Sequence, residues 1–441
     1  MNFLFFIILL ALFNSCSFDN KTGIWKNENN SLPSKNKIYK DFETISTSQN
    51  FFNETIVLKK NYNFDFSSPE TSINWTDILY APNNNFKNFN YNNLNKVLFK
   101  SKKISKYKVG KYKLFENDNL IISDERGNLL IFSFNENKIV RKFNFYKKKF
   151  RKIEKIINYA VENNIIYVGD NLGYLYAYNY ISDKILWAKD YKIPFNSNLK
   201  IFQDKIIISN QNNDLNILKK STGDLLKSIP TEEFFIKNQF KNNLSINNKG
   251  DVIFLNSFGS LYSVNLSSMK INWFNNFNQS FDFSSSNYFM GNQVINSDKV
   301  IVISSNKDTY LIDVKTGSVI KKFNFSSEIK PIIIKKNLII LSKNNFLINI
   351  DLDTKNIIYS YDISKEKKIK SNILNSNIFK EILILNSEIF IFLRDSSILV
   401  FNMNGNFKKT IKLPRKLNSF PIIQQDSILY LDNKNKLIIF D

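Results

Sequence analysis

One phrase of sequence recurs along the chain from Leu120 to the C-terminus. An apolar run is followed by a polar turn that often contains Gly, then by a second apolar or aromatic run, another polar turn, and a strand that can end in Trp. The clearest copy runs from Ile165 to Tyr178 and is closed by the segment from Lys184 to Trp187. A repeat of roughly forty to fifty residues made of short strands is typical of a β-propeller.

The first strands of successive hairpins are expected at regular intervals. They begin near Leu120, Ile165, Ile206, Val252, Val300, Leu338, Ile389 and Ile428. These starts lie about 38 to 51 residues apart, close to the period of propeller blades. The turns between the strands are rich in Gly, Asn and Asp, which accept the positive φ of tight hairpins. We therefore predict an all-β fold, an eight-bladed β-propeller with four-stranded antiparallel blades. A meander sandwich without a true repeat is the alternative.

The two ends of the repeat predict how the ring closes. The last hairpin, Ile428–Asp441, runs out of chain before its outer strand. An unpaired strand edge favours aggregation, so another part of the chain has to cover it. We expect Val97–Lys100 to complete this blade, which closes the ring with an N-terminal strand. Trp187 and Trp273 are expected at equivalent positions of two outer strands.

The charge of the chain is strongly basic, with a formal net charge of +22. Lys residues scattered over turns and strand edges are expected on a solvated surface, and attraction to an anionic membrane or to acidic partners is the functional alternative. The densest basic run, residues 147–152, is expected in a loop between blades. The sequence contains no zinc-finger spacing, aromatic RNA-binding motif or helix-turn-helix, so we predict no nucleic-acid partner.

The absence of His and the presence of a single Cys restrict the chemistry. They exclude Ser-His-Asp and Cys-His catalysis, His-ligated metals and an internal disulfide. The acidic residues are dispersed, and Asp170, Asp308 and Asp395 fall in hairpin turns, where Asp hydrogen-bonds its own backbone. We predict no catalytic residue, no metal site, no cofactor and no small-molecule substrate.

The N-terminus carries an unbroken apolar run, Phe3–Phe13, followed by Asn14-Ser15-Cys16. The run is too short to span a bilayer and is typical of a secretory signal peptide. The position of Cys16 resembles a bacterial lipoprotein processing site, which implies cleavage before Cys16 and acylation of that residue. The match departs from the usual pattern in Phe13, where Leu is usual, and in the lack of Lys or Arg near the start. A plain signal peptide and a signal anchor are the alternatives.

Three regions follow from these patterns. Residues 1–15 are the predicted signal peptide, and residues 16–69 are the lipidated Cys and a flexible tether, because much of this stretch is rich in Asn, Lys and Ser. Residues 70–441 form the propeller. The residue directly after Cys16 is Ser17 and not Asp, which resembles outer-membrane sorting and implies a protein anchored in outer-membrane lipid and facing the periplasm.

The segment Tyr167–Ala177 is similar to a pyrroloquinoline-quinone (PQQ)-like propeller repeat. With the lipoprotein signal, residues 70–441 resemble the assembly factor B lipoproteins of the bacterial β-barrel assembly machinery. This resemblance implies a non-catalytic scaffold that docks on the periplasmic domains of the central barrel-assembly protein and helps to insert outer-membrane β-barrels. A propeller that serves another envelope complex is one alternative. A PQQ-dependent dehydrogenase is the other, although many such enzymes place two adjacent cysteines against the cofactor, which this chain cannot do.

The segment from Glu232 to Lys237 is a candidate docking surface. It holds consecutive apolar residues with flanking charge in a link between blades, a composition that resembles an interface hot spot and its rim. Phe234, Ile236 and Lys237 are the expected partner-binding residues. The alternative is that this segment is the inner strand of the fourth blade.

Overall fold

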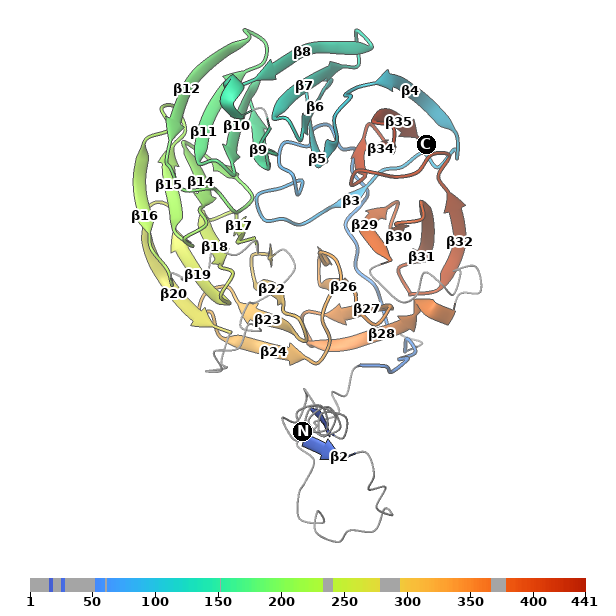
Figure 1. Ribbon diagram of the computed structural model, residues 1–441. Helices are drawn as coiled ribbons and strands as arrows, with labels where there is room; N and C mark the ends of the chain where they lie inside the picture. Colours follow the sequence, from blue (N-terminus) through green and yellow to red (C-terminus); the bar gives the residue numbers. More distant parts are fainter. Residues whose placement is uncertain are drawn as a thin grey trace, which may run out of the picture. The chain divides into compact units, whose positions relative to one another are not determined.

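The computed structural model describes residues 16–18, 25–27, 52–59, 62–150, 152–232, 241–277, 294–365 and 378–441. The chain divides into two compact units, Met1–Asn50 and Phe51–Asp441. In the first unit, β1 (Cys16–Phe18) pairs antiparallel with β2 (Trp25–Asn27). The second unit is a β-propeller (Figure 1). The described residues contain no helix long and apolar enough to cross a membrane.

The propeller has eight blades in the described part of the chain, each built on four antiparallel strands. In seven blades these four strands follow one another in sequence, and in the eighth the outer strand comes from earlier in the chain. The strands of blades 1 to 4 are β5 (Val109–Glu116), β6 (Asn119–Asp124), β7 (Asn128–Ser133), β8 (Lys138–Asn144); β9 (Ile157–Glu162), β10 (Ile165–Asp170), β11 (Tyr174–Asn179), β12 (Lys184–Asp190); β13 (Lys200–Phe202), β14 (Lys205–Ser209), β15 (Leu215–Lys219), β16 (Leu225–Ile229); and β17 (Asn243–Ile246), β18 (Asp251–Leu255), β19 (Ser260–Asn265), β20 (Lys270–Asn276).

The strands of blades 5 to 8 are β21 (Ile295–Asn296), β22 (Val300–Ser304), β23 (Thr309–Asp313), β24 (Val319–Phe323); β25 (Ile332–Ile334), β26 (Asn337–Leu341), β27 (Phe346–Asp351), β28 (Asn356–Asp362); β29 (Phe379–Leu385), β30 (Glu388–Leu393), β31 (Ser397–Asn402), β32 (Phe407–Lys412); and β33 (Ile422–Gln424), β34 (Ser427–Leu431), β35 (Lys436–Phe440), β4 (Val97–Lys103). The short 3-10 helices η2 (Lys148–Phe150) and η3 (Ile363–Lys365) lie between blades. The predicted fold and the eight predicted hairpin starts are confirmed.

Burial explains why the repeat is visible in the sequence. The middle strands of a blade are covered on both faces by neighbouring blades, as in β7, where all residues are buried. Such strands are continuous apolar runs, whereas the outer strand β8 has exposed and half-buried residues only. The inner hairpins therefore stand out in the sequence, and the outer strands do not.

The ring closes as predicted, because β4 supplies the outer strand of the last blade. Phe99 lies opposite Ile439 and Val97 lies opposite Phe440 in the antiparallel pairing of β4 with β35. One blade thus combines the C-terminus with a strand from the N-terminal part of the propeller. The short strand β3 (Asn88–Phe89) adds a parallel pairing to the inner edge of β29.

The two predicted outer-strand tryptophans occupy equivalent positions and connect neighbouring blades. The Trp187 indole donates a hydrogen bond to Lys220 O of the next blade at 3.0 Å, and the Trp273 indole donates to Val314 O at 3.0 Å. Each ring packs on the glycine of the next blade's Thr-Gly turn, so a Cβ added to Gly223 would lie 2.5 Å from Trp187. Each of these two Thr-Gly turns therefore packs against the outer-strand tryptophan of the preceding blade.

The chain before the ring already contacts the propeller from Phe52 onward. The Phe52 ring packs at 5.1 Å from that of Phe325, and Ile56 forms a β-bridge with Ser360 of blade 6. The Tyr62 hydroxyl donates a 2.6 Å hydrogen bond to the Asp351 carboxylate. Contacts with the propeller thus begin earlier in the chain than residue 70, where the composition led us to expect its start.

Candidate functional site

Residues 71–91, named the axial strap here, run through the middle of the ring and contact the inner part of every blade. In Figure 1 the blue segment that leads to β3 crosses the centre of the ring. Backbone hydrogen bonds join Ser72 to Gln425, Trp75 to Phe115, Thr76 to Val161, Pro82 to Ile246 and Asn83 to Asn296. Three further contacts join the strap to the remaining blades. Asp77 accepts a hydrogen bond from Lys200, Asn85 donates one to Ile333 O, and Asn88 pairs with Ile384 in the sheet.

A buried lysine fixes the strap to blade 3. Lys200 Nζ donates to the Asp77 carboxylate at 2.8 Å, and also to Ala81 O and Asn84 Oδ1. The side chains of Lys200 and Asp77 are 0% and 7% exposed. Burial lowers the pKa of Lys200, while the Asp77 carboxylate opposes that shift. The ammonium group is therefore compensated by an ion pair and further hydrogen bonds, as a buried charge requires.

The apolar side of the strap fills the axis with aromatic rings. Trp75, Phe86 and Phe89 are almost completely buried. The Trp75 ring centroid lies 5.5 Å from that of Phe86 and 5.9 Å from that of Phe89. Most strap contacts fall near the carboxyl ends of the inner strands, for example at Phe115 of β5 and Ile384 of β29. The strap therefore occupies the axis at this end of the inner strands.

The other end of the axis is hollow. A cavity of about 580 Å³, named the axial mouth here, lies where the inner strands of blades 1, 6, 7 and 8 begin. Leu79 of the strap is part of its lining, so the cavity is bounded on the strap side. The other lining residues are Lys111, Tyr112, Glu328, Ile329, Lys330, Phe379, Lys380, Glu381, Arg394, Lys416, Asn418 and Phe420.

The charges of the axial mouth are unbalanced. Burial raises the pKa of Glu328 to about 7, and burial also raises the pKa of Glu381 although Lys330 opposes the shift. The pKa of Lys380 is lowered to about 8 by burial and by the neighbouring charges of Lys111, Arg394 and Lys416. The two carboxyl groups are thus partly protonated near neutral pH, while the cations repel one another.

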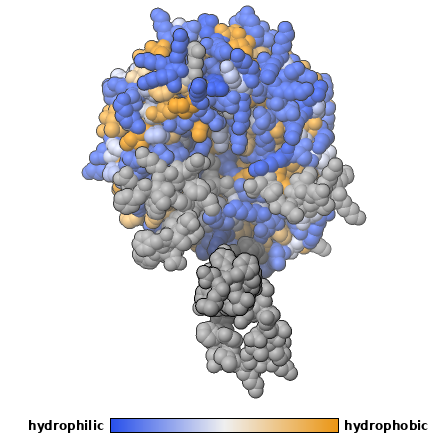
Figure 2. All heavy atoms as spheres, viewed as in Figure 1, coloured by the Kyte–Doolittle hydropathy of each residue, from blue (hydrophilic) through white to orange (hydrophobic). Residues whose placement is uncertain are grey.

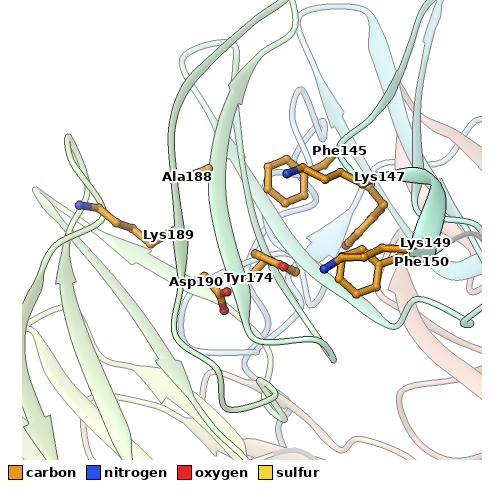
Figure 3. A pocket seen from close by; sticks show the side chains of 9 residues that line it. Phe145, Lys147, Lys149, Phe150, Tyr174, Ala188, Lys189 and Asp190 are labelled. Carbon is orange, nitrogen blue, oxygen red and sulfur yellow. The ribbon is translucent and has the colours of Figure 1, made fainter.

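A second cavity, of about 310 Å³, lies between blades 1 and 2. Figure 3 shows the rings of Phe145, Phe150 and Tyr174 gathered at it, with Lys147 and Lys149 beside them. The ring centroids of Phe145 and Tyr174 are 5.4 Å apart. This inter-blade pocket opens where β8 and β12 end, which is the same end of the ring as the axial mouth, because all blades repeat one strand order.

Local hydrogen bonds hold the inter-blade pocket in shape. The Tyr146 hydroxyl donates to the Asp170 carboxylate, which also accepts hydrogen bonds from Leu172 N at 2.8 Å and Tyr174 N at 2.9 Å. Burial raises the pKa of Asp170, and these donors oppose the shift. The prediction that Asp170 hydrogen-bonds its own turn is therefore confirmed. The basic run at 147–152 begins in the expected loop between blades, at η2.

The outer rim carries exposed apolar side chains on blades 2 to 5. Phe274 is 62% exposed on β20. The others on these outer strands are Ile185, Leu186, Leu225, Leu226, Ile271 and Val319. Figure 2 shows hydrophilic residues over most of the visible face, with hydrophobic residues in scattered patches.

Of the four predicted site residues, the structure describes only Cys16. Cys16 is the first residue of β1, and its acylation stays a prediction. Phe234, Ile236 and Lys237 lie outside the described residues. The alternative for this segment was the inner strand of the fourth blade. That strand is β17, Asn243–Ile246, which lies further along the chain. In the described ranges no three His, Cys, Asp or Glu side chains form a group that could hold a metal ion.

Sequence reasoning missed the axial strap and the axial mouth. The strap had a signal, because Trp75, Phe86 and Phe89 are large apolar residues in an otherwise Asn-rich stretch. The sequence signal for the axial mouth was weak. It consisted of charged residues, such as Lys330 and Glu381, directly beside apolar runs. Nothing in one sequence indicates that blades 1, 6, 7 and 8 bring these charges together.

The fold and these sites define an eight-bladed propeller with a strap along its axis, one cavity at the axis and another between two blades. A family model described as outer membrane protein assembly factor BamB matches residues 117–361. The chain belongs to this family, as the resemblance of its repeat indicated. No curated protein sequence matches the chain.

Solved structures share the fold at low sequence identity. BamB from Moraxella catarrhalis matches with a TM-score of 0.60 and 11% identity, over 79% of this chain and 100% of that chain. The computationally designed Ika8 protein matches with a TM-score of 0.57 and 8% identity, over 78% and 99%. The quinohemoprotein alcohol dehydrogenase from Comamonas testosteroni matches with a TM-score of 0.61 and 10% identity, over 84% and 81%.

Proposed function

We propose that this protein is a non-catalytic scaffold lipoprotein that assists the assembly and insertion of β-barrel outer-membrane proteins. In this proposal it is anchored in the outer membrane through Cys16, faces the periplasm and docks on the central protein of the barrel-assembly complex. The observation that carries the proposal is the family match over residues 117–361, which covers more than half of the chain. Assembly of outer-membrane proteins is the role named in the description of that family.

The inter-blade pocket supplies a docking surface in the described residues. Aromatic side chains in a partly desolvated pocket, rimmed by charge, are the usual anchors of protein interfaces. Phe150 and Tyr174 provide such rings, and Lys147 and Lys149 lie beside them (Figure 3). A partner segment that offers an apolar side chain beside acidic residues fits this lining. Phe234, Ile236 and Lys237 stay proposed as a second contact.

The test is a pull-down of the anchored protein from envelope membranes, with identification of its partners by mass spectrometry. Recovery of the central barrel-assembly protein is the expected result. Phe150→Ala is expected to weaken recovery by about tenfold or more, as loss of an interface anchor does. Phe274→Ala on the outer rim is the matched control and should leave recovery unchanged. If recovery falls with Phe274→Ala alone, the partner docks on the outer rim and not at the inter-blade pocket. Recovery of a different complex would contradict the proposed function.

The lipid anchor is tested separately. Cys16→Ser should remove labelling by fatty acid and release the protein from the outer-membrane fraction. A Ser variant that still fractionates with the outer membrane would contradict lipidation at Cys16.

A dehydrogenase is the alternative that the fold alone permits, since an alcohol dehydrogenase shares the propeller. The chain has no His and a single Cys. Dye-linked alcohol oxidation after addition of PQQ and calcium is expected to be absent. Its appearance would favour the enzyme over the scaffold.

A further inference from the structure

We propose that the axial mouth is a binding site for a small oxyanion, a phosphate or a carboxylate group, held by Lys330 with Lys111, Arg394 and Lys416. This goes beyond the proposed scaffold function and does not depend on it. The shared chemistry of the ligand is a compact negative charge with several acceptor oxygens. It could come from a free small anion or from the phosphate of a lipid headgroup.

The first observation is a buried ammonium group without a hydrogen bond. Lys330 is 6% exposed and lines the cavity, and its Nζ finds no hydrogen-bond partner in the described part of the chain. Its contact is the face of the Phe86 ring, at 3.4 Å from the centroid. A buried cation that lacks an acceptor is costly, so the site favours a ligand that supplies one.

The second observation is an excess of cations around this group. Lys111, Arg394 and Lys416 are exposed at the mouth, and none of them forms an ion pair with another described residue. All three line the same cavity as Lys380, whose pKa is lowered by burial and by these neighbouring charges. A concave site lined by charge of one sign concentrates ligands of the opposite sign.

The third observation is that the other two lysines, unlike Lys330, already have oxygen acceptors. Lys380 Nζ donates to Leu417 O at 2.8 Å and to Asn418 O at 2.7 Å. Lys113 Nζ, buried beside the mouth, donates to Ser419 Oγ at 2.9 Å and to Phe420 O. Both amines shape the loop from Leu417 to Phe420, which forms one wall of the cavity. The amine of Lys330 stays available.

The charge of Glu381 opposes the lowering of the Lys330 pKa by burial, but no carboxyl group of the described residues hydrogen-bonds the Lys330 amine. Glu381 Oε1 accepts a hydrogen bond from Ile382 N at 3.1 Å, and no ion pair within 4.0 Å joins it to Lys330 among the described residues. Glu328 Oε1 is buried without a hydrogen-bond partner. A protonated Glu328 could donate to an oxyanion, so this carboxyl group is compatible with the proposed ligand.

The experiment measures binding of inorganic phosphate and of citrate to the full-length chain in detergent, by equilibrium dialysis at constant ionic strength set with chloride. Saturable binding of at least one anion is expected. Lys330→Met should weaken it by about tenfold or more, the loss expected for a hydrogen bond to a charged group. Lys111→Met combined with Lys416→Met, which changes exposed residues only, should also weaken it. Lys227→Met, an exposed outer-strand lysine, is the matched control and should have no effect.

Vesicles of phosphatidylcholine with and without phosphatidylglycerol distinguish the source of the anion. Binding to phosphatidylglycerol that depends on Lys330 identifies a lipid phosphate, and binding of the free anions alone identifies a soluble ligand. The proposal is overturned if no anion binds saturably, or if Lys330→Met and Lys227→Met reduce binding equally. The scaffold function and the anion site are tested independently, because the variants used in the pull-down do not change these lysines.

Discussion

Lys200 and Lys330 are two buried lysines near the axis of the same ring, and their surroundings differ sharply. Lys200 has three oxygen acceptors supplied by the axial strap, including the Asp77 carboxylate. Lys330 has an aromatic face and no acceptor among the described residues. The comparison teaches that the strap supplies oxygen acceptors to one buried ammonium group and only an aromatic face to the other, which leaves the amine of Lys330 for the proposed ligand.

The largest expected effect comes from removing the strap. Deletion of residues 71–91 takes away contacts with all eight blades and the buried rings of Trp75, Phe86 and Phe89. Burial of each ring contributes about 1.5–3 kcal/mol, so the total loss approaches the whole stability of a typical domain. Circular dichroism should show no cooperative melt. The control, deletion of residues 52–59, removes contacts around blade 6 only and should lower the melting temperature slightly. Equal melting of the strap deletion and the parent would contradict a structural role.

A smaller difference is expected between two matched substitutions. Lys200→Met leaves the Asp77 carboxylate buried without its partner and should cost about 3–5 kcal/mol of unfolding free energy. Lys330→Met removes a buried amine that lacks an acceptor and should be neutral or stabilising. Urea denaturation of both variants against the parent provides the measurement. Similar losses in the two variants would contradict this difference between the two buried lysines.

The smallest expected effect is a pH dependence at the axial mouth. The pKa of Glu328 is raised to about 7 in the folded protein from an ordinary value of 4.5. The folded state therefore binds this proton more tightly, so the contribution of Glu328 to stability is fully present below pH 4.5 and is lost as the pH rises to about 7. Glu328 is partly exposed, and solvent screening reduces the loss to about 1 kcal/mol.

Glu328→Gln abolishes this titration. The variant should be more stable than the parent at pH 8 by about 1 kcal/mol and should differ less at pH 5. Thermal melts at the two pH values test the sign. A variant that is less stable than the parent at pH 8 would show that the carboxyl group is ionised and compensated in the folded protein.

Features that depend on residues close together in the sequence could be predicted, whereas features that depend on contacts between distant segments could not. The hairpins at Ile165 and Val252 depend on local apolar runs and turn residues, so their positions were predictable. The closing strand at Val97 followed from a missing strand at Ile428–Asp441. The strap was not predictable in this way, because Asn83 and Asn84 bond backbone groups of distant blades, and such pairings leave no periodic pattern.

The axial mouth was hidden for a related reason. Lys111, Glu328, Glu381 and Lys416 come from four different blades, and each one by itself has the sequence signature of a solvated surface residue. The burial of Glu381 and the electrostatic interactions among the four charges arise only when the ring is closed. The segment with Phe234 and Ile236 had a clear local signal, but its role stays a prediction.

Native-state hydrogen exchange tests most directly whether one end of the axis is part of the fold and the other is an open site. The amides of Val161, Ile246 and Asn296 donate to carbonyl groups of the strap. They are predicted to exchange only through global unfolding, whereas the amide of Phe420, which donates to Lys111 O at the mouth, should exchange through local opening. Exchange of the three strap-bonded amides at rates as fast as that of Phe420 would contradict the account.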